Sequence, residues 1–411
     1  MQTLAVGQFV GVFVRWRTEV AIWLVSVGYG FFAWWIYGWR PGVFQAGGYV
    51  TWFDQSSYIK QTALLANFAL PNPDAYQYGL GYPIVGVPFY WMGVTADPLL
   101  IPDLILLATS MVLSFRLALR LTDSRVIAYA LILILLFSSP LIVLTIVPWS
   151  TSVTLICVVG ALLVASRPFS ASGSLWMGFF AGWSFSARYI DVLLILFIAV
   201  YYIALERGVA LAKAVGCFAA TAGTQVVLVA ISQWLVFGSP LITPYTSHVD
   251  KMTGTSDQSL AHYRWQVIPR HFWETFVSGW DTPVGTRSDH DPLLFITPIL
   301  ILLPLGIWLA IQRSPGLRGF HVAAITGTLV QGAIYLSFRA GGGGNLHFNN
   351  ARYWIASYPY WLILSLVAAV WLARTTRART TRNHPSRRPG VSESLIRPDA
   401  AKGKNGYGRT D

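Results

Sequence analysis

The chain has 411 residues, of which 55% are hydrophobic and only 11% are charged. Soluble domains carry about 25% charged residues, so this composition excludes an ordinary soluble fold. The formal net charge of +12 would suggest a nucleic-acid partner for a soluble protein. Here the positions of the charges along the chain account for it better, and we expect no nucleic acid among its partners.

Repeated apolar runs of about 20 residues predict an all-α polytopic membrane protein, because a helix of that length spans a bilayer. The first run begins near Val20, is long and aromatic, and lacks a small-residue cleavage site, so we expect it to remain as an anchor. We predict about ten spans, at residues 20–38, 99–119, 126–146, 149–166, 173–187, 190–206, 209–236, 292–311, 320–338 and 353–373.

Lys and Arg near the ends of these spans alternate between a rich and a poor side. The positive-inside rule then places both termini in the cytoplasm. We expect a multi-pass protein of the cell (plasma) membrane. Three parts follow: a cytoplasmic segment at residues 1–19, a transmembrane domain at 20–373 and a basic tail at 374–411. The tail is rich in Arg, Thr, Pro, Ser and Gly and has little to bury, which predicts disorder.

Three outer segments are long, at about residues 39–98, 237–291 and 339–352. The first contains a predicted juxtamembrane helix from Gln55 to Phe68, whose apolar and aromatic residues recur at helical spacing. Its second part, residues 82–94, is apolar but short and rich in Pro and Gly, so we interpret it as re-entrant or interfacial.

The outer segments combine few acids with several arginines and many aromatic residues, which suits one reaction class. Transfer of a sugar from a lipid phosphate to a hydroxyl needs one carboxylate as general base and cations to hold the departing phosphate. Arginine offers a fork of donors matched to phosphate oxygens. Among the candidate residues in or beside these segments are Asp54, Lys60, Tyr78, Tyr82, Arg188, Asp191, Tyr245, Arg264, Asn350 and Arg352.

Several short motifs, in order along the chain, resemble membrane glycosyltransferases of the GT-C superfamily, closest to the protein O-mannosyltransferase and aminoarabinose transferase branch. These motifs are Trp52-Phe53-Asp54-Gln55, Tyr-Gly-Leu-Gly-Tyr-Pro at 78–83, Ser-Ala-Arg-Tyr at 186–189, Phe-Gly-Ser-Pro at 237–240 and Asn350-Ala351-Arg352-Tyr353. The resemblance touches most of the chain up to about residue 373. The sequence departs from the family at Gln55, where the common pair is Asp-Glu, and we expect no large C-terminal domain of the kind found in some branches.

The resemblance implies that Asp54 is the catalytic base and that a polyprenyl-phosphate-linked sugar is the donor. The acceptor would be a hydroxyl of a glycan, lipid or protein, and one direct displacement would invert the anomeric carbon. We assign the donor phosphate to Arg188 and Arg352, with Lys60 or Arg264 in support, and the pocket wall to Tyr78, Tyr82, Tyr245 and Asn350. No metal-ligand motif is present, and whether the reaction uses a divalent metal stays open.

Plainer interpretations exist for the same residues. Asp54 precedes the predicted helix and fits an N-cap, and any of Lys60, Arg188 or Arg352 fits an interfacial anchor that contacts membrane lipid. The Tyr and Trp residues fit an aromatic belt. For the whole chain, the alternatives are a transporter or lipid flippase of the cell envelope and a non-catalytic membrane scaffold.

Overall fold

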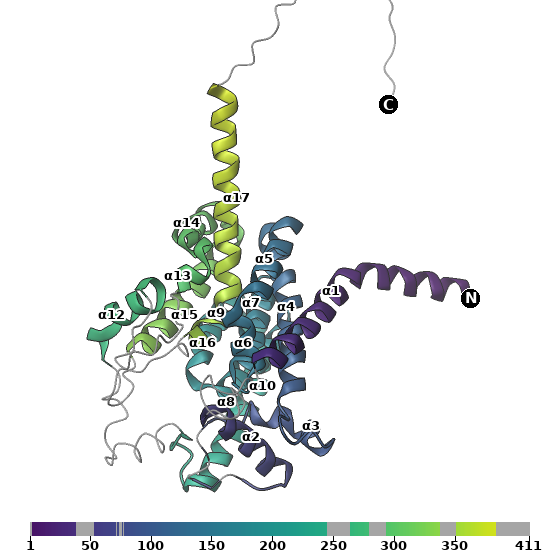
Figure 1. The fold of residues 1–411 in the computed structure, drawn as a ribbon, viewed down its shortest axis with the longest axis vertical. Coiled ribbons are helices and arrows are strands. Elements are labelled where there is room, and N and C mark those ends of the chain that lie inside the picture. Colours follow the sequence, from purple (N-terminus) through teal and green to yellow (C-terminus); the bar gives the residue numbers. More distant parts are fainter. Residues whose placement is uncertain are drawn as a thin grey trace, which may run out of the picture. The chain divides into compact units, whose positions relative to one another are not determined.

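The computed structural model describes residues 2–37, 53–70, 72–73, 76, 78–244, 264–278, 293–337 and 351–383 (Figure 1). Every regular element in these ranges is a helix, which confirms the predicted all-α class. The chain divides into two units, Met1–Ala369 and Val370–Asp411.

The α-helices are α1 (Gln2–Tyr37), α2 (Phe53–Ala66), α3 (Val87–Trp91), α4 (Leu100–Thr122), α5 (Arg125–Phe137), α6 (Ser139–Ile146), α7 (Thr151–Ala165), α8 (Ala171–Ala187), α9 (Val192–Ala204), α10 (Gly208–Phe237), α12 (Ile268–Trp273), α13 (Leu293–Ile296), α14 (Leu303–Arg313), α15 (Arg318–Ser337), α16 (Ala351–Trp354) and α17 (Tyr358–Asn383). Short 3-10 turns connect several of them: η2 (Pro83–Gly86), η3 (Tyr189–Asp191), η5 (Trp265–Val267), η7 (Pro298–Leu302) and η8 (Pro315–Leu317). A single π-helical turn, η6 (Glu274–Ser278), follows α12.

Among the described residues, five helical segments are long and apolar enough to cross a membrane. They are Trp16–Ile36, Leu100–Thr122, Gly208–Phe237, Pro315–Ser337 and Tyr358–Ala378. Shorter apolar helices at Arg125–Phe137, Thr151–Ala165, Tyr189–Ala204 and Pro298–Arg313 lie in four of the other predicted spans. The structure thus bears out a helical protein of membrane character, and five of the ten predicted spans have full-length helices.

The predicted span at 353–373 begins in α16 and continues in α17 after a turn at 355–357. Two other predicted spans are interrupted in their interior, each near a proline. The run predicted as one span at 126–146 forms α5 and α6, because Ser138 is extended and Pro140 lies in the first turn of α6. The run at 292–311 is divided into α13, η7 and α14 at Thr297 and Pro298. Proline lacks the N–H that would donate to the carbonyl four residues earlier, so a preceding helix cannot continue through Pro140 or Pro298. Pro298 also keeps the residue before it, Thr297, out of helical conformation.

Hydrogen bonds at both ends of α4 and α7 give the direction of the chain through this part of the structure. Ser152, near the start of α7, donates to Asp103 in the first turn of α4, and Arg120, in the last turn of α4, donates to the carbonyl of Ser166 just after α7. The two helices therefore run parallel. It follows that α5 and α6 together return the chain from the end of α4 to the start of α7.

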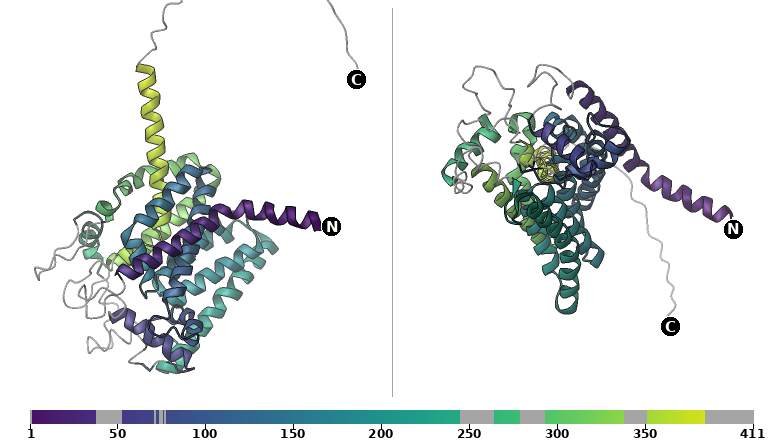
Figure 2. Two further views of the ribbon diagram at one scale, coloured as in Figure 1. Left: turned by 45° about the vertical axis from the view of Figure 1, so that its right-hand side comes forward. Right: turned by 90° about the horizontal axis from the view of Figure 1, so that it is seen from below.

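The same logic orders the helices that follow. Thr221 and Gln225 of α10 donate to the carbonyls of Leu175 and Phe179 of α8, so α8 and α10 run parallel, side by side (Figure 2). Helix α9, which lies between α8 and α10 in sequence, returns the chain and packs against α15. Gly319 at the start of α15 lies next to Tyr201 near the end of α9, whereas Gln331 further along α15 donates to Asp191 just before α9. The two helices are therefore antiparallel.

The structure consequently has two distinct ends. We call the end holding the starts of α4 and α7 and the end of α8 the motif end, because it carries residues 78–83 and 186–189. We call the opposite end, which holds the ends of α4 and α7, the arginine end, after Arg116, Arg120 and Arg167. Helix α1 is antiparallel to α4, since Glu19 pairs with Arg116 and Trp34 donates to Asp97 near the start of α4.

Helix α7 forms the centre of the core. All of its residues except Val164 are buried, and it contacts α4, α6, α8 and α9. A helix that is apolar on every side is stable only when surrounded. By contrast, α10 buries only Ala214, Val229 and Gln233 and exposes many large apolar side chains, as expected for a surface that faces lipid.

The predicted first-loop elements are present with small shifts. The helix predicted at residues 55–68 is α2, Phe53–Ala66, and the apolar piece at 82–94 forms the short helices η2 and α3. The helix α17 continues to Asn383, past the Arg374 boundary predicted for the tail. The predicted tail from residue 384 onward lies outside the described residues. So do residues 39–52 of the first outer segment, 245–263 and 279–291 of the second, and 339–350 of the third.

Candidate active site

The Tyr78–Pro83 motif is docked onto the Ser186–Tyr189 motif at the end of α8. The backbone N–H of Gly81 donates to the carbonyl of Ser186 at 3.0 Å, and the indole of Trp183 donates to the carbonyl of Gly81 at 2.8 Å. The approach is so close that a Cβ at Gly81 would lie 2.0 Å from Oγ of Ser186, and one at Gly79 would lie 2.2 Å from its carbonyl oxygen. Two motifs about a hundred residues apart in sequence therefore form one structural unit.

Aromatic stacking joins this unit to α2. The ring of Tyr58 stacks on Tyr78 with centroids 4.7 Å apart and meets Tyr82 edge to face at 4.9 Å. Such arrangements are the preferred geometries of aromatic pairs. Since Tyr58 and Asp54 both belong to α2, the helix that begins at Phe53, the stacking fixes α2 beside the Tyr78–Pro83 motif.

The hydroxyl of Tyr82 is buried and bonded within the protein. It donates to Oδ2 of Asp103 at 2.7 Å, while Ser152 donates to Oδ1 of the same carboxyl at 2.6 Å. Burial and the adjacent carboxyl raise the pKa of the Tyr82 hydroxyl well above its usual value. Tyr82 therefore links residues 78–83 to α4 and α7. The side chain of Tyr78 is half-buried.

A buried ion pair lies next to this unit. Arg188 approaches Asp191 with Nη1 and Oδ2 3.6 Å apart, and both side chains are less than a tenth exposed. Oδ1 of Asp191 accepts hydrogen bonds from Gln331 at 2.7 Å and from Tyr335 at 2.5 Å. A buried ion pair is stable only when further hydrogen bonds satisfy its members, and these two donors from α15 satisfy the Asp191 carboxylate.

The guanidinium of Arg188 also reaches the motif that contains Arg352. It lies 5.4 Å from the centre of the Tyr353 ring, within range of a cation–π interaction, and Tyr353 stacks on Tyr335 at 4.1 Å. The sequence predicted that Arg188 and the Asn350–Tyr353 motif would come together. The structure places Arg188 against Tyr353 of that motif. The side chain of Arg352 lies outside the described part.

The first outer segment is also held against α10. Tyr76 shares a hydrogen bond with Ser232 at 3.2 Å and stacks on Phe237 with centroids 5.4 Å apart. Burial raises the pKa of the Tyr76 hydroxyl. The hydroxyl of Tyr189 accepts a hydrogen bond from Gln233 of the same helix at 2.8 Å. The start of the Phe237–Pro240 motif is therefore placed beside the other motifs.

The remaining candidates are placed as follows. Asp54 is the second residue of α2, inside its first turn and not before the helix, and its side chain lies outside the described part. A carboxylate in a first turn is favoured by the helix dipole. Lys60 is exposed on α2, and Arg264 is exposed while its backbone N–H donates to the carbonyl of Ser337. Tyr245 and Asn350 lie outside the described residues.

Two acids that the candidate set omitted belong to the same end. Asp103 is completely buried between Tyr82 and Ser152, and Asp97 is 3% exposed and accepts a hydrogen bond from Trp34 at 3.2 Å. Burial raises the pKa of Asp97 to about 6, and the Trp34 hydrogen bond offsets this only in part. Acids beside or inside an apolar span are functional hypotheses by default, and the pattern Asp-Pro-Leu-Leu-Ile-Pro-Asp at 97–103 carries that signal.

No protein-family model matches the chain, and no curated protein matches it either. The interpretation of the site therefore depends on its own geometry. Within the described ranges, no group of three or more His, Cys, Asp or Glu side chains is arranged to hold a metal ion. The motif end combines a stacked aromatic surface, the Arg188 guanidinium paired with Asp191, and a buried carboxyl, Asp97, whose pKa is raised by burial.

Proposed function

We propose that the chain is an integral membrane glycosyltransferase of GT-C type, which transfers a sugar from a polyprenyl-phosphate donor to a hydroxyl acceptor. One observation supports this most directly: segments from four parts of the chain, three of them carrying the motifs, meet at the motif end. Tyr58 of α2, residues 78–83, residues 186–189 and Tyr353 are joined there by the contacts described above. A protein whose loops merely connected spans would not need such convergence.

In the proposed reaction, the Asp54 carboxylate accepts the proton of the acceptor hydroxyl as its oxygen attacks the anomeric carbon. The bond from that carbon to the phosphate oxygen breaks, and the electron pair leaves with the phosphate. The products are an inverted glycoside, a polyprenyl phosphate and a proton on Asp54. General-base assistance of this kind contributes about 100-fold to 10,000-fold in rate.

The departing phosphate gains negative charge, so cations that face it lower the barrier. We assign this role to Arg188 and Arg352, with Lys60 or Arg264 in support. Because Asp191 already compensates the charge of Arg188, Arg352 carries the larger share. Tyr78, Tyr82, Tyr245 and Asn350 shape the surroundings, with Tyr82 acting through its fixed hydrogen bond to Asp103.

In this proposal the chain crosses the plasma membrane about ten times. The five long helices would span it, and so would the α5–α6 pair, α7, α8, α9 and the α13–α14 segment. The parallel pairs α4–α7 and α8–α10 support this arrangement, because the segment between the members of each pair must return across the bundle. Both termini would be cytoplasmic, and the motif end would face outward.

A transporter or lipid flippase is the second candidate. It is favoured by the Arg188–Asp191 pair and by Asp103, which are buried ionisable groups within or beside apolar helices. Against a translocation path, Asp103 and Asp191 each accept hydrogen bonds from two neighbouring side chains, which fixes them in place.

The test uses purified full-length protein in proteoliposomes with a panel of labelled polyprenyl-phosphate sugars and hydroxyl acceptors. We expect wild-type protein to release polyprenyl phosphate from one donor, and Asp54→Asn to lose about 100-fold or more of that rate. Glu206→Gln, the same carboxyl-to-amide change in the loop after α9, should keep the full rate. Transfer at the wild-type rate by Asp54→Asn would refute the assignment, and lipid movement without donor consumption would favour the flippase.

A further inference from the structure

A pocket of about 830 Å³ lies at the arginine end, far from the motifs. Its walls come from α1, α4 and α7, and its charged residues are Glu19, Arg116, Arg120, Asp123 and Arg167. Asp103, which belongs to the motif end, is 17 residues from Arg120 along α4, a distance of roughly 25 Å at the rise of an α-helix. The pocket is therefore separate from the proposed active site.

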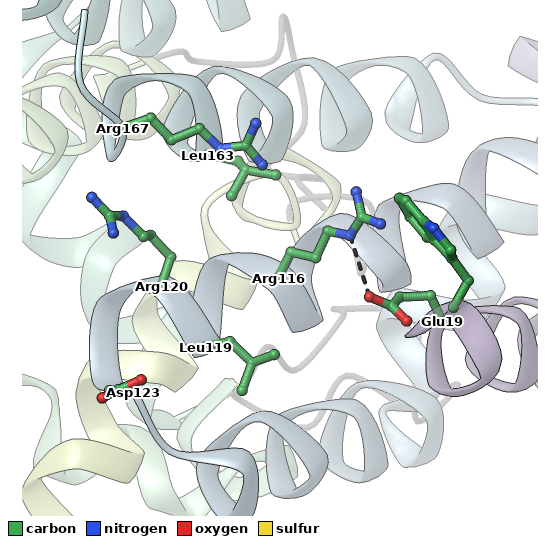
Figure 3. Close-up of a pocket in the computed structure, with 8 residues that line it drawn as sticks. Glu19, Arg116, Leu119, Arg120, Asp123, Leu163 and Arg167 are labelled. Atoms are coloured by element: carbon green, nitrogen blue, oxygen red, sulfur yellow. Dashed lines mark ion pairs between the residues drawn. The ribbon is translucent and has the colours of Figure 1, made fainter. Parts of the chain in front are cut away.

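The three guanidinium groups are held differently (Figure 3). Arg116 is engaged on both sides, because its Nε lies 3.6 Å from the Glu19 carboxylate and its guanidinium lies 4.1 Å from the centre of the Trp16 ring. Arg120 donates through Nε to the carbonyl of Ser166 at 3.0 Å, which orients it and leaves its terminal nitrogens available. Arg167 is exposed at the rim.

The charge in the pocket is only partly compensated. Arg116 has a carboxylate partner, whereas within the described part of the chain neither Arg120 nor Arg167 forms an ion pair. Figure 3 shows Arg120 and Arg167 on the side of the pocket away from Glu19. Asp123 also lines this side (Figure 3), so the pocket as a whole holds three guanidinium groups and two carboxylates, a net charge of +1. Two guanidinium groups that form no ion pair beside a hollow can bind an anion, and planar guanidinium forks match phosphate oxygens best.

We propose that this pocket binds a phosphate group, carried either by the headgroup of an anionic membrane lipid or by a soluble phosphate. The volume is within the range of small-ligand sites. Because α4 and α7 both end here, their dipoles disfavour an anion, so binding depends on the arginine side chains and not on backbone N–H groups. Basic residues that only anchor helices at a membrane surface do not need a pocket between them. The pocket distinguishes this cluster from such anchors.

The experiment measures binding to the purified full-length protein in neutral detergent micelles by titration calorimetry. One arm uses short-chain phosphatidylglycerol, a second uses inorganic phosphate, and short-chain phosphatidylcholine is the zwitterionic reference. The test variant is Arg120→Gln with Arg167→Gln. The matched control is Arg207→Gln with Arg318→Gln, which removes the same charge from exposed positions outside the pocket. Arg167→Gln alone, at an exposed residue, covers the case in which the double variant fails to fold.

We expect wild type and control to bind phosphatidylglycerol equally, and the double variant to bind at least about tenfold more weakly. If inorganic phosphate does not compete, the ligand is a lipid headgroup; if it binds with the same arginine dependence and competes, the ligand is a soluble phosphate. Equal binding by wild type and double variant in both arms overturns the proposal, as does an equal loss in the control. None of these outcomes depends on transferase activity.

Discussion

Asp97 shows how burial at the motif end changes the chemistry of one residue. Its folded pKa of about 6 lies above the ordinary value of 3.8, so the folded protein holds this proton more tightly than the unfolded chain does. Stability then falls as the pH rises from about 4 to about 6, and above that range a charged and buried carboxylate remains.

We therefore predict that Asp97→Asn removes this pH dependence. Relative to wild type, the variant should gain stability between pH 4 and 6, by up to about 3 kcal/mol above pH 6. Thermal unfolding of the detergent-solubilised proteins from pH 4 to 8 measures the difference, because other titrating groups cancel in the comparison. Parallel curves for the two proteins would show that Asp97 is not the group responsible.

For single residues, the sequence predicts which side chains lie at the motif end, but not which partner each of them bonds. The sequence predicts that Arg188 faces a donor phosphate. In the structure Arg188 also has a counter-ion, Asp191, which is a candidate from the same turn but is not predicted to pair with it. Tyr82 was predicted to shape a pocket, and its hydroxyl instead bonds Asp103. Asp103 was not a candidate because it lies inside a predicted span, and periodicity does not tell which buried acid meets which hydroxyl.

At the element scale, every predicted span corresponds to one or more helices, and the first-loop helix is displaced by only two residues. Apolar length determines helices well, because lipid leaves backbone groups no other partners. The predicted spans do not contain the breaks at Ser138 and Thr297, because hydropathy measures how apolar a run is and not whether its backbone hydrogen bonds are continuous. The docking of residues 78–83 onto α8 was also beyond the sequence, since it depends on contacts about a hundred residues apart.

That docking predicts a specific effect of substitution at Gly81. Gly81→Ala should push residues 78–83 away from Ser186, because the new Cβ would collide with that residue. We expect lower thermal stability and lower transfer activity together. The matched control is Gly223→Ala in α10, where nothing lies within 4 Å of the added Cβ and alanine favours the helix. Gly81→Ala protein with unchanged stability and activity would contradict the docking.

At the scale of the whole molecule, the number of crossings decides where the termini lie. Five crossings would place the two termini on opposite sides of the membrane, whereas ten would place them on the same side. Reporters fused before Gln2 and after Arg374 should both read cytoplasmic if the ten-span arrangement holds. A third reporter in the segment 245–263 should read external. Termini on opposite sides would overturn the arrangement and with it the outward-facing motif end.

The central proposal for this protein is that the motif end transfers a sugar from a lipid phosphate, with Asp54 as the base. The most direct measurement compares envelope glycans and lipid-linked sugars, by mass spectrometry, in cells with the wild-type gene, without it, and with only Asp54→Asn. We predict that one sugar modification disappears and one polyprenyl-phosphate sugar accumulates in both the deletion and the Asp54→Asn cells. Restoration of the wild-type glycans by Asp54→Asn would contradict the central claim.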